Sequence, residues 1–179
     1  VPALVGSLAL VLSACGGSSP DSGGSSDTSG TLRVVAGFYP LAYAAEQVGG
    51  DGVEVINLTP PGGEAHDLEL SPQQVAEIGE ADLILYIPGF QPALDEAIAQ
   101  VAPDRALNVT EALTLLPAED HADEGDHADE GDHADEHSEL DGDPHVWLNP
   151  LNMATIGDEI ATRLTALNAD GPFASGAQA

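Results

Sequence analysis

Basic residues are nearly missing from this chain of 179 residues. Lysine is absent, and three arginines face 31 acidic side chains, which gives a formal net charge of −28 at pH 7. Nucleic-acid binding requires clustered lysine and arginine to neutralise phosphates, so nucleic acid is excluded as a partner. Anionic lipid also repels a surface of this charge, so any membrane contact must come through something other than the protein face.

Cysteine is equally scarce, because Cys15 is the single cysteine and no disulfide can form within the chain. The apolar run before it, residues 1–14, is shorter than the roughly 18 residues that a membrane span needs. It ends in the sequence LSAC, which is similar to the lipobox of bacterial lipoproteins. We interpret residues 1–14 as a partial lipoprotein signal peptide and Cys15 as a lipid anchor to the cell membrane. The alternative is a free thiol.

The folded part is expected to span residues 31–168. Residues 15–30 are almost entirely Gly, Ser, Asp, Thr and Pro and predict a flexible tether, and residues 169–179 are interpreted as a tail. Between them, short β-rich runs alternate with helical patterns, which indicates an α/β fold with a parallel sheet flanked by helices. The expected strands cover residues 32–36, 53–58, 82–87 and 106–109. The expected helices cover 41–48, 94–101 and 150–167, with one from Pro72 behind a Ser71–Gln74 capping box and a short one capped by Thr110.

An acidic repeat interrupts this alternation over residues 118–143. The sequence His-Ala-Asp-Glu occurs three times there, the segment has no aromatic residue, and it holds 13 of the 31 acids. A loop of this length inside a compact domain is usually functional or disordered, and we expect a disordered loop that collects cations. A merely solubilising segment is the alternative. The repeat holds four of the six histidines, namely His121, His127, His133 and His137.

The two remaining histidines are the candidate ligands of a selective metal site. His66 and His145 each follow an acid by two residues, Glu64 and Asp143, and each is expected in a loop at the carboxyl end of a strand. Paired imidazoles suit Zn²⁺, and a ligating imidazole usually donates its second N–H to a carboxylate, the role expected for the two acids. At this spacing either acid could instead cap a turn, and Asp67 and Glu69 are alternative ligands.

Four segments in order resemble the solute-binding lipoproteins of zinc and manganese ABC importers. They are residues 37–41 (GFYPL), 61–72 (PGGEAHDLELSP), 81–86 (ADLILY) and 143–150 (DPHVWLNP). The resemblance implies a two-lobed binding protein without enzymatic activity, in which His66 and His145 supply the first two ligands from the N-terminal lobe. It further implies that the remaining ligands come from a C-terminal lobe that this sequence lacks. Partners would be an ABC permease and, through the lipid, the membrane, with the protein acting as an extracytoplasmic monomer.

Metal choice follows from the same resemblance, because zinc-type members often carry a His- and acid-rich loop before the second ligand. Zinc is therefore the expected cargo, and manganese or iron is the alternative. A zinc-dependent envelope hydrolase or a metallochaperone lipoprotein is the alternative of another class. Two departures from the family pattern are Ala65, where many members have proline, and residues 88–92, which lack an Asn-Gly pair; the second weakens any inference about the metal-specific branch.

Overall fold

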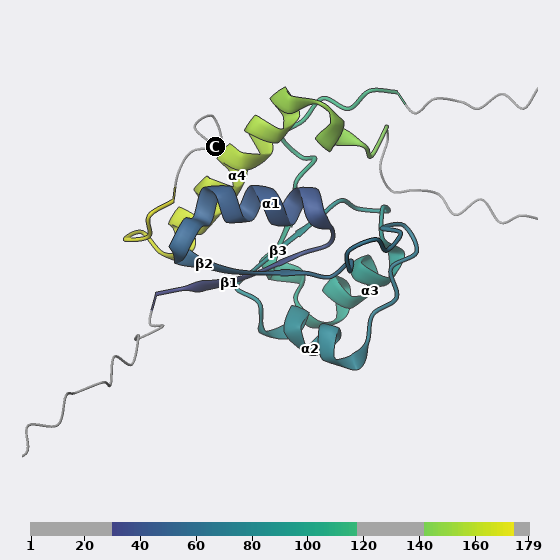
Figure 1. Ribbon diagram of the computed structural model, residues 1–179, viewed down its shortest axis with the longest axis horizontal. Helices are drawn as coiled ribbons and strands as arrows, with labels where there is room; N and C mark the ends of the chain where they lie inside the picture. Colours follow the sequence, from purple (N-terminus) through teal and green to yellow (C-terminus); the bar gives the residue numbers. More distant parts are fainter. Residues whose placement is uncertain (1–29, 118–141, 174–179) are drawn as a thin grey trace, which may run out of the picture.

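The computed structural model describes residues 30–117 and 142–173 (Figure 1). The predicted signal segment, Cys15 and the tether lie outside the described residues, as do all four histidines of the acidic repeat. His66 and His145 lie within them. Among the described residues no helix is long and apolar enough to cross a membrane.

A four-stranded parallel sheet forms the centre of the molecule, which confirms the predicted fold class. The strands have the order β2-β1-β3-β4, and every neighbouring pair is parallel. They are β1 (Leu32–Ala36), β2 (Val53–Asn57), β3 (Leu83–Tyr86) and β4 (Ala106–Asn108). The central strands are mostly apolar, with the sequences LRVVA in β1 and LILY in β3, as expected for a sheet that is covered on both faces.

Four α-helices connect and cover these strands, and each has a proline in its first turn. Proline is favoured there because its missing N–H would have no partner in the helix. The helices are α1 (Tyr39–Gly49), α2 (Pro72–Glu80), α3 (Pro92–Val101) and α4 (Pro150–Leu167), with short 3₁₀ turns η1 (Gly50–Gly52), η2 (Pro103–Arg105) and η3 (Val146–Leu148). Helices α1 and α3 therefore begin two residues earlier than predicted.

The helices lie in two layers, one on each face of the sheet (Figure 1). Helices α1 and α4 enclose one core with alternate residues of β1 and β3, and α2 and α3 enclose a second core with the residues between them. Phe173, in the segment interpreted as a tail, also packs against the first core.

The capping box at the start of α2 forms as predicted. The side chain of Ser71 accepts a hydrogen bond from the backbone N–H of Gln74, and the side chain of Gln74 accepts one from the backbone N–H of Ser71. The predicted short helix behind Thr110 is wrong, because residues 110–113 form only a turn closed by the bond from Leu113 N to Thr110 O. The hydroxyl of Thr110 donates to Asn108 Oδ1 at 2.7 Å and so does not cap a helix.

The strand order places a topological switch point between β1 and β3. The chain leaves β1 toward β2 on one side and returns to β3 on the other, so the loops after β1 and β3 diverge at their carboxyl ends. Open α/β sheets bind ligands at this position.

Arg105 joins the ends of two helices on the lower layer of Figure 1. Its guanidinium donates to Gly79 O, within α2, at 2.8 Å and to Ala81 O, just after α2, at 2.7 Å. It also donates to Val101 O, the last residue of α3, at 3.2 Å. The last carbonyls of a helix have no partner within the helix, so an arginine that bonds them replaces water with a fixed donor.

We expect Arg105→Ala to lower the free energy of unfolding by about 1–3 kcal/mol, because three carbonyls lose a charged donor. Arg163→Ala is the matched control, since Arg163 is exposed on α4 and its loss changes the net charge equally. The control should cost less than about 0.5 kcal/mol in urea unfolding. Equal losses in the two variants would contradict a specific role for Arg105.

Candidate metal centre

His145 is held by an acid two residues earlier in the sequence, Asp143. The carboxylate of Asp143 contacts the ring Nδ1 of His145 at 2.6 Å and accepts from its backbone N–H at 2.9 Å. With Nδ1 engaged as a donor, the opposite ring nitrogen, Nε2, is left as the acceptor and can bind a metal. The backbone N–H and then the ring N–H of His145 stabilise the charged carboxylate and lower the pKa of Asp143 below its ordinary value.

Gly142 fixes the approach of the chain to Asp143. Its φ of +146° is a conformation that other residues rarely adopt, and a Cβ atom there would lie 2.7 Å from the Cβ of Leu115. The next residue, Asp143, donates its backbone N–H to Leu116 O at 2.8 Å. The last residue of the acidic segment is therefore hydrogen-bonded to the chain just before the segment, and His145 follows two residues later at the start of η3.

His66 lies in the loop between β2 and α2, and it is held differently. The carboxylate of Glu64 accepts from the backbone N–H of His66 at 3.5 Å. The carboxylate thus closes the turn, the alternative left open for both acids. The ring of His66 packs against Phe90, with the ring centroids 4.2 Å apart.

The fold brings the two imidazoles together from loops that are distant in the sequence. Their ring centroids are 5.8 Å apart, and both residues are exposed to solvent. A zinc–nitrogen bond of about 2.0–2.1 Å places the ion about 3 Å from each ring centroid, so two rings on one ion have centroids at most about 6 Å apart. The observed separation of His66 and His145 therefore allows one ion to bind both.

Within the described residues, the two histidines are a pair of candidate ligands without a third. No group of three or more His, Cys, Asp or Glu side chains within residues 30–117 and 142–173 is arranged to hold a metal. Asp67 and Glu69, the alternative ligands, do not complete such a group with His66. A tetrahedral zinc ion bound to the two imidazoles would accept two further ligands.

An aromatic cluster lies beneath the two histidines, and the sequence reasoning did not identify it. Phe90 contacts Phe38 and Trp147 at centroid distances of 4.8 and 5.3 Å, and Trp147 lies 5.2 Å from His145. Phe90 and Phe38 are buried, at 4% and 3% exposure. They follow β3 and β1, so this cluster fills the switch point and forms the floor of the site. Its three members lie in segments 37–41, 88–92 and 143–150, which the sequence analysis had singled out for other reasons.

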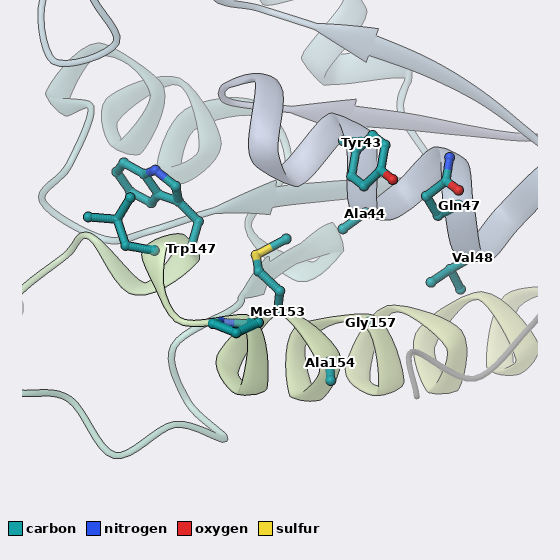
Figure 2. Close-up of a pocket in the computed structure, with 10 residues that line it drawn as sticks. Tyr43, Ala44, Gln47, Val48, Trp147, Met153, Ala154 and Gly157 are labelled. Atoms are coloured by element: carbon teal, nitrogen blue, oxygen red, sulfur yellow. The ribbon is translucent and has the colours of Figure 1, made fainter. Parts of the chain in front are cut away.

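Two cavities lie near η3, and they differ in the residues that line them. A cavity of about 400 Å³ lies between α1 and α4, where Tyr43, Gln47, Trp147 and Met153 line it (Figure 2). Its lining contains no histidine or acid. A second cavity of about 280 Å³ is lined by both Asp143 and His145. Trp147 therefore links the two regions, because it lines the first cavity and its ring lies 5.2 Å from that of His145.

Comparison with known proteins agrees with this geometry. The family model described as the periplasmic component A of a zinc-uptake complex matches residues 34–172. The chain belongs to this family. The matched region includes both candidate histidines and all four strands except the first two residues of β1.

Proteins similar to this chain carry names for more than one metal. The high-affinity zinc uptake system protein ZnuA of Bacillus subtilis is 37% identical over 147 residues, which cover 79% of this chain and 44% of that protein. The manganese-binding lipoprotein MntA of Halalkalibacterium halodurans is 26% identical over 167 residues, 92% of this chain and 48% of that protein.

A solved structure gives the same likeness. Zn(II)-bound AdcA from Streptococcus pneumoniae superposes with a TM-score of 0.60 at 26% identity, covering 79% of this chain and 27% of that one. The chain thus spans less than half the length of each of these three proteins.

The contrast between the two acids gives a prediction about zinc affinity. We expect Asp143→Asn to weaken Zn²⁺ binding about tenfold or more, because the ring of His145 loses the charged acceptor that orients it. Glu64→Gln removes one negative charge at the same spacing from the other histidine and should cost clearly less. Titration calorimetry on a chain in which a Gly-Ser linker replaces residues 118–141, called the shortened chain, measures both without the repeat histidines. Equal losses would show that only charge matters.

Proposed function

We propose that this protein is the extracytoplasmic zinc-binding component of an ABC-type importer, which captures Zn²⁺ and delivers it to a membrane permease. The observation that carries the proposal is the pair of imidazoles 5.8 Å apart at the switch point of a zinc-uptake family fold. One of them is oriented by a carboxylate, as ligating histidines usually are. Binding and release, without catalysis, is the activity that this role requires.

We place the remaining ligands on a C-terminal lobe, as the resemblance implies. Two imidazoles leave a tetrahedral zinc ion two ligands short, and both histidines face solvent at the carboxyl edge of the sheet. Closure of a second lobe over this edge would complete the shell and exclude water. Opening would reduce the number of ligands again, which gives a route for release to the permease.

The segments outside the described residues have roles in the same proposal. Cys15 carries the lipid anchor, and residues 15–30 act as the tether that lets the protein reach the permease. The four histidines of the acidic repeat form an accessory collector. Its 13 acids raise the local concentration of cations, an effect that salt weakens, while the selective site retains the ion.

Manganese is the second candidate cargo, because a relative is named as manganese-binding. The two imidazoles favour zinc, which ranks above manganese at nitrogen ligands. The completing ligands decide the question: a third histidine favours zinc, and a pair of carboxylates favours manganese. Competition between Zn²⁺ and Mn²⁺ for the protein with both lobes distinguishes the two.

The assignment of the site predicts which deletions abolish zinc binding. We expect His66→Ala and His145→Ala each to weaken one-to-one Zn²⁺ binding by the shortened chain below the range of titration calorimetry, because a single imidazole remains. Compared with the full chain, the shortened chain should bind fewer Zn²⁺ ions in total, because the repeat histidines are gone, and it should keep the one-to-one site. The assignment is wrong if the two alanine variants keep this binding while the shortening abolishes it.

The ligand count also predicts a weak affinity. We expect the shortened chain to bind Zn²⁺ with a Kd in the micromolar range or weaker, because half of the tetrahedral shell is supplied by water. Quenching of Trp147, the single tryptophan, would report the ion because its ring lies 5.2 Å from that of His145. A nanomolar Kd, about −12 kcal/mol, would contradict a two-ligand site.

A further inference from the structure

Gln91 is a buried amide at the meeting point of three loops. Its side chain is 2% exposed, and its Nε2 lies within hydrogen-bonding distance of acceptors that follow β1, β2 and the turn before His66. These acceptors are Gly37 O at 3.2 Å, Thr59 Oγ1 at 3.1 Å and Ala65 O at 2.9 Å. The contact with Ala65 O is the shortest of the three.

The chemistry of this contact requires a donor at position 91. The hydroxyl of Thr59 donates its own hydrogen to Gly37 O at 2.7 Å, so it can only accept from Gln91. The two hydrogens of the amide are therefore shared among three acceptors. Gly37 leaves the space for this amide, because a Cβ atom there would lie 2.2 Å from the Oε1 of Gln91.

The bond to Ala65 O acts directly on the first ligand. Ala65 O and His66 N belong to one peptide unit, which is planar, so a hydrogen bond to the carbonyl also fixes the direction in which the backbone of His66 leaves. The contact from Glu64 on the other side of this unit is long, at 3.5 Å. Phe90, the neighbour of Gln91, packs against the ring. Adjacent residues of one segment thus hold both the backbone and the imidazole of His66.

We propose that Gln91 is a positioning residue for the metal site, which holds the Ala65–His66 peptide so that the imidazole of His66 reaches the same ion as His145. This inference rests on the proposed function. It gives a role to residues 88–92, the segment in which the chain departs from the family pattern. It also explains why a polar side chain is buried at the start of α3, where its own helix does not use the amide.

The test is Gln91→Met in the shortened chain, which keeps the length of the side chain and removes the donor. We expect Zn²⁺ affinity to fall about tenfold, the size typical of residues that orient a ligand. In the His66→Ala background the same substitution should change the residual affinity less than twofold, because its effect passes through His66. NMR titration, followed at the His145 ring signals, measures these weak affinities.

A control separates positioning from loss of stability. Arg105→Ala lies among contacts with α2 and α3 and away from the histidines, so it should lower Tm without weakening zinc binding. The imidazole signals of His66 in the metal-free protein should shift in Gln91→Met and stay unchanged in Arg105→Ala. A merely structural role for Gln91 would make the two variants alike in both measurements.

Each remaining outcome has one meaning. No zinc binding by the unsubstituted shortened chain would overturn the proposed function itself. Zinc binding that His66→Ala removes and Gln91→Met leaves at full strength would overturn only the positioning role. If Gln91→Met lowers Zn²⁺ affinity by the same factor with and without His66, Gln91 acts through the fold in general. That result would also overturn the positioning role.

Discussion

The packing of Phe90 is the constraint on which the site depends. This buried ring contacts His66 at 4.2 Å and His145 at 6.3 Å, and it also packs against Phe38 and Trp147. Ligands that capture an ion from solution must be exposed, so they cannot be ordered by burying themselves. Their order must come from a rigid layer below. Here that layer is aromatic and fills the switch point, where the strand order leaves a gap between diverging loops.

The fold was predictable because its signals are local. Short runs rich in Val, Ile and Leu mark the strands, and the capping box and the glycine at φ +49° mark the start of α2 and the end of α1. The errors arose where two local signals compete. Thr110 resembles an N-cap, but Asn108 accepts from both its backbone N–H and its hydroxyl and closes a tight turn. A side chain that satisfies the backbone within two residues removes the need for a helix.

The site was predictable only in part, for a related reason. The same spacing of acid and histidine gives a backbone contact at both Asp143 and Glu64, and a ring contact in addition at Asp143. Pro144 restricts the backbone between Asp143 and its histidine, whereas the turn before Glu64 contains Gly62 and Gly63. Spacing alone therefore does not fix orientation. The roles of Phe90 and Gln91 depend on contacts across the sheet, and no pattern along the sequence carries that information.

The two candidate ligands consequently differ in what orders them. The partner of His145 is two residues away, so its orientation survives as long as that short turn is formed. The backbone at His66 is held by Gln91, 26 residues from Ala65, and this contact exists only when β1, β2 and α3 are assembled. An ion that binds both imidazoles binds only the assembled form and stabilises it by mass action. In the proposed function, zinc occupancy would thereby be coupled to the long-range packing of the lobe through His66, while His145 would offer a first contact to an arriving ion.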